Sequence, residues 1–452
     1  MIIDESIFKA FDIRGIYPSQ LNDDVAFLIG LAFAQKTNSK QVVVGRDMRN
    51  GGDNLKKNLI NGLIQGGVKE IIDIDLVPID SVYFGLGKLK YESGIMITAS
   101  HNPKEYNGFK MIGKNLKTIR GIDLYKTVNK LSEQNIEKKK LKAKIINKNI
   151  YPAHIKHILS FANLKTIKPL KVVVDAGNGM AGKMMPILSK YLPIKMIPLH
   201  FKLDGNFPNH PSNPLMPESQ AKIAKKIKQT KADFGVIFDG DTDRLFFVDE
   251  MGKFIRADLT LLLLAKLFLE REPGKGIAYN LICSKIVEEK VKEWGGRPIR
   301  TAVGYVNVSD GMKKNDGIIG GEISAHYSFR DNYYFDSGFI ALVILLELLS
   351  KDGRKISQII KPFDKYPKLP EINIEMNNRK NILAKIEKVK IKYKKYKQDY
   401  MDGVTVDNWE NGGWWFNVRA SNTEPLLRLT IEAKNKKVLL KLRKELTDFI
   451  KK

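Results

Sequence analysis

The chain has 452 residues, of which 43% are hydrophobic and 9% aromatic, and its formal net charge is +26. This length exceeds what one hydrophobic core serves, so we expect three or four domains of roughly 100–150 residues each. The composition is typical of a soluble globular protein, and the single cysteine, Cys283, excludes an internal disulfide.

The positive charge does not indicate a nucleic-acid-binding protein. Most of the 76 basic residues are lysines scattered over helix-like stretches, whereas base recognition favours clustered arginines and aromatic side chains. The most apolar runs, 259–269 and 339–349, are shorter than the roughly 20 residues that span a bilayer. The first residues are acidic and do not resemble a signal peptide. We expect a cytoplasmic protein with no specific nucleic-acid partner and no membrane partner.

In chain order, three segments repeat a strand, a loop and an amphipathic helix. The strands are rich in apolar and β-branched residues at 41–44, 171–174 and 276–282, and a helix is expected near 284–293 after the last of them. This alternation is typical of α/β domains with mixed or parallel sheets. Functional loops in such domains follow the carboxyl ends of strands.

Three stretches suggest domain boundaries: the lysine-rich, structure-poor segment 137–149, the turn 249–252, and the proline-containing segment 361–370. Beyond residue 370 the pattern changes to that of a small α+β domain built around an antiparallel sheet. The expected strands are 371–375, 403–406, 414–418 and 427–433, and the expected helices are 378–396 and 436–451.

The segment 98–103, with the sequence TASHNP, follows a short buried strand that ends at Ile97. Proline restricts the residue before it, so Ser100 is presented on a stiff, exposed loop. Taken alone, this segment is more typical of an ordinary polar turn. A serine presented in this way is a candidate nucleophile.

A second loop carries three carboxylates at alternating positions after the strand 236–238. Asp239, Asp241 and Asp243 can direct hard oxygen ligands at one point, which suits Mg²⁺. Gly240 permits a tight turn, and Arg244 offers a guanidinium suited to phosphate. No helix is expected before this loop, which argues against an EF-hand and leaves a solvated acidic turn as the alternative. Together with the serine, this loop suggests phosphoryl chemistry.

Three further motifs are weak when taken singly. In the segment 321–326, Glu322 and Ser324 pair an acceptor with a donor, as sugar hydroxyls require, and His326 can transfer protons near neutral pH. The loop 419–425 combines an arginine, hydroxyls and backbone N–H groups into a potential anion cradle. A structural histidine and a capped turn are the alternatives. The segment 11–15 places Arg14 beside a glycine turn.

In their order and spacing, these five motifs resemble those of the α-D-phosphohexomutase family, and the chain is most similar to its bacterial phosphomannomutase/phosphoglucomutase branch. The resemblance covers essentially the whole length. It implies an α/β fold of three related mixed-sheet domains and a smaller α+β C-terminal domain around a central cleft. The domains expected on this basis are 1–150 with the phosphoserine loop, 151–252 with the metal loop, 253–366 with the sugar loop, and 367–452 with the phosphate loop.

The resemblance also implies roles for particular residues. Ser100 is expected to be the phosphorylated residue, and Lys110 or His326 the acid or base. The catalytic residues implied are Ser100, Lys110, Arg14, His101 and His326. The metal ligands implied are Ser100, Asp239, Asp241 and Asp243. The substrate-binding residues implied are Tyr17, Arg244, Glu322, Ser324, His326, Arg419, Ser421, Asn422, Thr423 and Arg428.

The implied activity is interconversion of hexose 6-phosphate and hexose 1-phosphate through a phosphoserine enzyme, with Mg²⁺ and a hexose 1,6-bisphosphate. Ile323 and the run 421–423 favour mannose and glucose over glucosamine as the sugar, with mannose expected first and a phosphoglucosamine mutase as the alternative. A metal-dependent sugar phosphatase or a basic RNA-binding protein would leave several motifs unused. The expected partner is a phosphorylated hexose, and the expected state is a monomer or homodimer.

Overall fold

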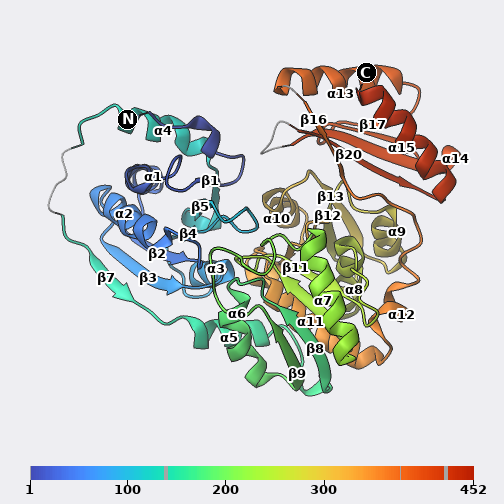
Figure 1. Ribbon diagram of the computed structural model, residues 1–452, viewed down its shortest axis with the longest axis horizontal. Coiled ribbons are helices and arrows are strands. Elements are labelled where there is room, and N and C mark those ends of the chain that lie inside the picture. The colour runs from blue at the N-terminus through green and yellow to red at the C-terminus, as the bar shows by residue number, and fades with distance from the viewer. Residues whose placement is uncertain (1, 137–140, 377, 422–425, 452) are drawn as a thin grey trace. The chain divides into compact units, whose positions relative to one another are not determined.

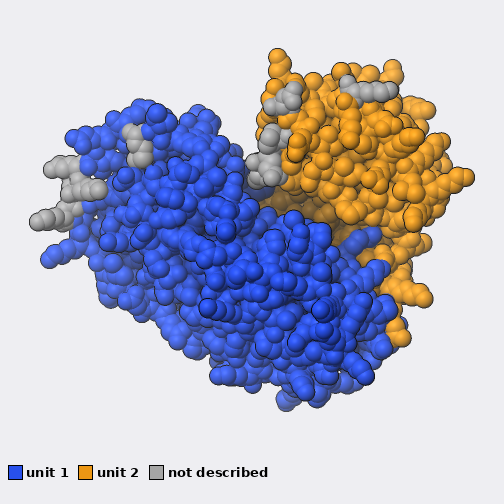
Figure 2. Space-filling model, in the orientation of Figure 1, with its two compact units in different colours: residues 1–256, 324–357 blue, residues 257–323, 358–452 orange. Residues whose placement is uncertain are grey.

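The computed structural model describes residues 2–136, 141–376, 378–421 and 426–451. The chain forms two compact units, which Figure 2 distinguishes by colour: unit 1 holds residues 1–256 and 324–357, and unit 2 holds residues 257–323 and 358–452. The chain therefore leaves unit 1 after Arg256, returns at Ser324 and leaves again after Ser357. None of the helices in the described ranges has the length and apolar composition that a membrane crossing requires.

The first sheet of unit 1 has the strand order β1-β5-β4-β2-β3-β7, with β6 paired to β5 (Figure 1). The strands are β1 (Ile13–Ile16), β2 (Gln41–Arg46), β3 (Glu70–Leu76), β4 (Ser93–Ile97), β5 (Tyr106–Ile112), β6 (Thr118–Ile119) and β7 (Lys144–Asn147). Strands β4, β2, β3 and β7 run parallel, and β5 joins β4 in the antiparallel sense. The fully buried β4 ends three residues before Ser100.

Strand β7 corrects one expectation, because the segment 137–149 is not structure-poor throughout. Residues 144–147 pair in parallel with β3, while residues 137–140 lie outside the described part of the chain. β7 lies at the edge of the sheet and is exposed at most of its positions. An exposed edge strand needs no apolar face and often carries lysine, so its composition resembles that of a loop.

The first sheet packs against helices α1 (Asp23–Thr37), α2 (Gly52–Gln65), α3 (Ile79–Gly87) and α4 (Ile122–Ser132). Asn22 caps α1 by accepting a hydrogen bond from the Val25 N–H. Helices α1 and α2 pack closely because Gly30 of α1 lies against the backbone of α2. A Cβ on Gly30 would lie 2.2 Å from the Leu59 carbonyl oxygen. Both helices, with α4, share one apolar core with the sheet.

The second sheet of unit 1 has the order β11-β10-β8-β9. Strands β8 (Leu170–Asp175), β9 (Ile194–Leu199) and β10 (Phe234–Phe238) are parallel, and β11 (Leu245–Val248) is antiparallel to β10. Unit 1 is completed by α5 (Tyr151–Leu159), α6 (Ala181–Leu188), α7 (Pro217–Thr230), β15 (Tyr327–Phe329) and α11 (Gly338–Asp352). As in the first sheet, the carboxyl ends of the strands carry the polar loops, including the one that begins at Asp239.

In unit 2, strands β13 (Arg297–Thr301), β12 (Gly276–Asn280) and β14 (Gly317–Gly321) are parallel neighbours. The associated helices are α8 (Ala257–Arg271), α9 (Lys285–Glu293) and α10 (Tyr305–Lys314). Helix α9 begins where expected, because the Ser284 hydroxyl caps it by accepting from the Ile286 N–H. α12 (Ile356–Ile360) lies where the chain passes from unit 1 into unit 2.

The C-terminal part of unit 2 is an antiparallel sheet with the order β16-β20-β19-β18-β17. Its strands are β16 (Ile372–Glu375), β17 (Lys397–Asp399), β18 (Val404–Asn408), β19 (Trp414–Ala420) and β20 (Leu426–Ala433). Helices α13 (Arg379–Lys392) and α15 (Lys436–Lys451) pack on it and share its core, and α14 (Trp409–Gly412) is a short turn between strands. The expected α+β architecture is confirmed; the short, polar β17 had no apolar pattern to reveal it.

Candidate active site

The serine loop has a backbone that L-amino acids rarely adopt. Ser100 lies in the left-handed region, with φ of +49°, and such a conformation persists only where surrounding contacts hold it. Its N–H donates to the Thr98 hydroxyl at 2.9 Å, and that hydroxyl lies 2.6 Å from Asp47 Oδ2. Asp47 is buried, and burial raises its pKa. The loop is therefore supported from strand β2 as well as from its own strand.

Arg49 provides the main support of this loop, and no sequence motif pointed to it. Its guanidinium donates to the carbonyl oxygens of Ser100 and Asn102 at 2.8 and 2.6 Å, and to those of Pro103 and Tyr106 at 2.8 and 2.9 Å. The side chain is buried, and it lies 4.9 Å from the ring centroid of Phe207. Only a planar donor group with several N–H bonds can bind so many carbonyls at once.

The three aspartates of the second loop converge as the sequence predicts. Ligand oxygens of Asp239, Asp241 and Asp243 lie within 4.8 Å of one another, and all three residues are buried. Asp239 Oδ2 accepts a hydrogen bond from the Ser100 hydroxyl at 2.6 Å. A Cβ on Gly240 would lie 2.6 Å from the Ser100 carbonyl oxygen, so only glycine permits the two loops to approach this closely.

The charges of this carboxylate cluster call for a cation. Burial, together with the charges of Asp243 and Asp241, raises the pKa of Asp239 well above its usual range. Burial also disfavours ionisation of Asp243, but Lys110 and His326 outweigh it and hold that pKa well below the usual range. Within the described part of the chain, the buried Oδ1 atoms of Asp241 and Asp243 accept no hydrogen bond, although His326 Nε2 lies 3.5 Å from Asp243 Oδ1. Buried hard oxygen atoms around one point fit a divalent metal ion such as Mg²⁺.

Two cations expected from the sequence lie at this cluster. Lys110, on β5, donates to Asp241 Oδ2 at 2.8 Å and also to Asp243 Oδ2. Arg14, on β1, donates to the Ala99 carbonyl oxygen at 3.2 Å and to the Asn102 side chain, and it is paired with Asp12. Burial opposes its charge, but Asp12 more than compensates and raises the pKa of Arg14.

His101, Arg244, Ser324 and His326 also belong to unit 1 and lie around the aspartates. His326 Nε2 lies 3.2 Å from Arg244 Nε and 3.5 Å from Asp243 Oδ1, and its Nδ1 lies 2.9 Å from the Ser324 hydroxyl. His101 Nδ1 lies 3.3 Å from the Ser100 hydroxyl. Burial lowers the pKa of His101, and the charge of Arg244 lowers it further. His101 is therefore a neutral ring beside the serine.

Tyr17 was predicted to bind substrate, but none of its described side-chain contacts is with Ser100. Its hydroxyl accepts from Asn54 at 3.4 Å, and its ring lies where a Cβ on Gly51 would stand. The ring packs against the apolar core of the first sheet.

In unit 2, Glu322 follows β14 and accepts hydrogen bonds from the Asn280 side chain at 2.9 Å and from the Gly304 N–H at 2.7 Å. Arg419 and Arg428 are directly opposite each other on β19 and β20. Both pair with Glu371, at 2.7 and 3.3 Å.

Two like charges in cross-strand register destabilise a sheet unless anions neutralise them. Arg419 is 2% exposed, and its Nε donates no hydrogen bond to any of the described residues. Glu371 pairs with both guanidinium groups and the charge of Asp402 interacts with both, and two adjacent guanidinium groups are suited to bind a phosphate. Ser421, which follows β19, is buried, whereas Asn422 and Thr423 lie outside the described residues.

Comparison with known proteins identifies the class of protein to which this chain belongs. Four family models of phosphoglucomutase/phosphomannomutase match in order: alpha/beta/alpha domain I at residues 5–138, domain II at 150–252, domain III at 256–366, and the C-terminal domain at 371–449. These matches, with the relatives below, define an intramolecular phosphotransferase that acts on hexose phosphates.

The chain belongs to the phosphoglucomutase/phosphomannomutase family. It is 38% identical to a phosphomannomutase of Vibrio cholerae over 98% of both chains. It is 37% identical to the phosphohexose mutases of Xanthomonas campestris over 96% of this chain and 97% of the relative. A crystal structure of a family member from Burkholderia thailandensis superposes with a TM-score of 0.87 at 32% identity, covering 100% of this chain and 98% of the other.

Proposed function

We propose that the chain interconverts mannose 6-phosphate and mannose 1-phosphate, and also the corresponding glucose phosphates, through phosphorylated Ser100 and a bound hexose 1,6-bisphosphate. The observation that carries this proposal is the 2.6 Å contact between the Ser100 hydroxyl and Asp239, within a cluster of buried carboxylates and cations. The names of the relatives from Vibrio cholerae and Escherichia coli, both phosphomannomutases, support mannose as the sugar.

Asp239, Asp241, Asp243 and the oxygen on Ser100 would hold Mg²⁺, which would stabilise negative charge that develops during phosphoryl transfer. Lys110 is placed to bind the transferring phosphoryl group, because its amine already lies among the carboxylates. Arg14 reaches the Ala99 carbonyl oxygen and the Asn102 side chain, which flank Ser100, and would bind a second face of that phosphate. This is the charge stabilisation on which phosphoryl transfer depends.

In this reaction the phosphoryl group would pass from phosphorylated Ser100 to a hydroxyl of the sugar. A sugar hydroxyl attacks the phosphorus of phosphoserine, the bond from phosphorus to Ser100 Oγ breaks, and a bond to the sugar oxygen forms. The hydroxyl proton passes to a base, for which Lys110 and His326 are the candidates, and the product is a bisphosphate. After the bisphosphate turns over, its other phosphoryl group returns to Ser100 and the hexose is released with its phosphate moved. A related fungal N-acetylphosphoglucosamine mutase has been crystallised with glucose 1,6-bisphosphate.

The remaining predicted residues would bind the substrate. Glu322, held by the Gly304 N–H and by Asn280, presents an ordered carboxylate suited to sugar hydroxyls. Arg419 and Arg428 lie directly opposite each other, and their adjacent guanidinium groups suit the phosphate that does not react. We further propose that 1–150, 151–252, 253–366 and 367–452 act as separate domains that contribute these loops.

The proposal is tested by intact-mass measurement and a coupled assay. The wild-type protein should carry one phosphate, about 80 Da, which Ser100→Ala lacks. It should convert mannose 1-phosphate and glucose 1-phosphate, with stimulation by hexose 1,6-bisphosphate, and Ser100→Ala should lose all but a trace of turnover. An unphosphorylated enzyme that turns over fully without bisphosphate would refute the phosphoserine mechanism.

A further inference from the structure

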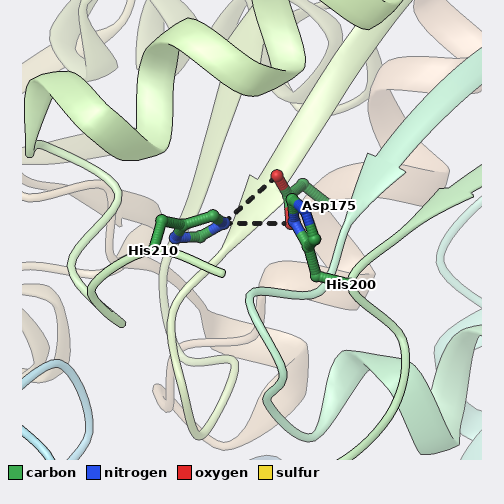
Figure 3. Close-up of side chains that lie close together, drawn as sticks. All are labelled: Asp175, His200 and His210. Carbon is green, nitrogen blue, oxygen red and sulfur yellow. Dashed lines mark hydrogen bonds and ion pairs between the residues drawn. The ribbon is translucent and has the colours of Figure 1, made fainter. Parts of the chain in front are cut away.

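A second cluster of potential metal ligands lies in unit 1 and has no part in the site described above. Asp175 is the last residue of β8, His200 directly follows β9, and His210 lies in the loop beyond it. Because β8 and β9 are parallel neighbours, their carboxyl ends lie side by side. Figure 3 shows both imidazole rings directed at the Asp175 carboxylate.

The side chains of this cluster are hydrogen-bonded to one another, and their separations lie close to those between the ligands of one metal ion. His200 Nδ1 lies 2.9 Å from Asp175 Oδ1, and His210 Nε2 lies 3.3 Å from both carboxylate oxygens. The three ligand atoms lie within 4.8 Å of one another. In a tetrahedral zinc site with bonds of about 2.0–2.1 Å, neighbouring ligand atoms are separated by about 3.3 Å. The cluster needs only a small movement to enclose an ion.

The hydrogen bond at Nδ1 of His210 fixes which ring nitrogen faces the carboxylate. Its Nδ1 lies 2.8 Å from the Pro211 carbonyl oxygen, which accepts only, so Nδ1 carries a proton. Nε2 therefore faces the carboxylate either as part of an imidazolium ion or with a lone pair free for a metal. Outer hydrogen bonds of this kind, from the second ring nitrogen to a carbonyl, orient metal-binding histidines.

The Asp175 carboxylate faces both imidazole rings, and its Oδ1 also accepts a hydrogen bond from the Gly177 N–H at 2.9 Å. Asp175 is fully buried, whereas the His200 side chain is 14% exposed. Solvent can therefore reach the cluster from the His200 side and provide a fourth ligand.

We propose that Asp175, His200 and His210 bind one divalent transition-metal ion of the zinc type. Two imidazole nitrogens and one carboxylate favour such an ion over Mg²⁺, which prefers oxygen ligands. Binding would connect the ends of β8 and β9 to the loop that carries Ser212, whose hydroxyl donates to the Asn102 carbonyl oxygen at 3.1 Å. The ion would thus fix a loop that supports the serine loop.

The test uses the full chain, stripped with a chelator, dialysed and then titrated with Zn²⁺ in excess Mg²⁺, which occupies the carboxylate cluster at Asp239. Zinc content per chain and the thermal midpoint are measured. Wild-type protein should retain about one zinc ion and gain thermal stability. His200→Gln should lose the bound zinc and the thermal shift. His157→Gln, at a histidine in the same unit, is the matched control and should bind as the wild type does.

A second arm separates this cluster from the aspartate cluster. Asp241→Asn should retain the zinc ion and its thermal shift. With Co²⁺ in place of Zn²⁺, wild-type protein should show the visible absorption of a tetrahedral site, and both His200→Gln and His210→Gln should lack it. Equal zinc content and equal thermal shifts in wild type and His200→Gln would overturn the proposal, as would the absence of retained zinc in the wild type.

Discussion

Replacing Arg49 with lysine tests what holds the serine loop in its left-handed conformation. The substitution keeps the positive charge beside Asp47, so it removes the shape of the donor group without removing its charge. An ammonium group has three donors, whereas the guanidinium binds four carbonyl oxygens of the loop between residues 100 and 106. At least one of these carbonyls loses its partner.

The magnitude follows from these contacts. Leaving a buried acceptor without a partner costs about 1–3 kcal/mol, and the lost stacking on Phe207 adds about 0.5–1 kcal/mol. We expect Arg49→Lys to lower the free energy of unfolding by about 1.5–4 kcal/mol. A displacement of about 1 Å at a reacting atom costs about 100-fold in rate, so kcat/KM should fall by about that factor.

Urea unfolding and steady-state kinetics with hexose 1-phosphate measure the two effects. Arg354→Lys is the matched control, because Arg354 is exposed and pairs only locally with Asp352. The control should change stability by no more than about 0.5 kcal/mol. If Arg49→Lys matches this control in both its urea midpoint and its kcat/KM, the guanidinium does not position the serine loop.

Three further outcomes are expected. Asp241→Asn should lower kcat far more than it raises KM, because a metal ion acts on charge that develops during phosphoryl transfer. Steady-state kinetics across Mg²⁺ concentrations test this prediction, and full activity in excess EDTA would contradict it. Arg419→Ala should lower kcat/KM for both hexose 1-phosphates by roughly 10- to 150-fold, the value of one charge-assisted contact, with partial recovery in Arg419→Lys; unchanged kinetics would remove the phosphate-binding role. Burial lowers the pKa of His154 to about 3. Below about pH 6.5 the unfolded chain therefore binds a proton at this residue that the folded chain does not bind. As a result, the free energy of unfolding falls as the pH falls. His154→Asn should remove about 2 kcal/mol of the stability that the wild type loses between pH 7 and pH 5, measured by urea unfolding at each pH; equal losses would show that this group does not titrate as described.

The strands and the polar loops that follow them could be predicted from local sequence. Runs such as 171–174 are β-branched and bounded by turn residues, so their conformation depends mainly on near neighbours. The same holds for the three aspartates, since alternating positions on one tight loop bring their side chains together over a few residues. Strands β7 and β17 escaped prediction because an edge strand needs little apolar surface.

Convergence between distant segments was decided by the tertiary structure. The serine loop follows β4 of the first sheet and the aspartate loop follows β10 of the second, so their 2.6 Å contact depends on how two separate sheets pack. Arg49 reaches its carbonyls across more than fifty residues of chain. The cluster of Asp175, His200 and His210 likewise forms because β8 and β9 pair in parallel.

The sequence alone therefore determined which chemical groups this protein carries and on which loops they stand. Residue types and turn geometry are local properties, and a serine before Asn-Pro or an alternating aspartate loop can be recognised without the fold. The tertiary structure decided which of these groups meet, which of them are buried and what their pKa values become. Burial and long-range pairing depend on the whole packed chain, and no local pattern contains that information.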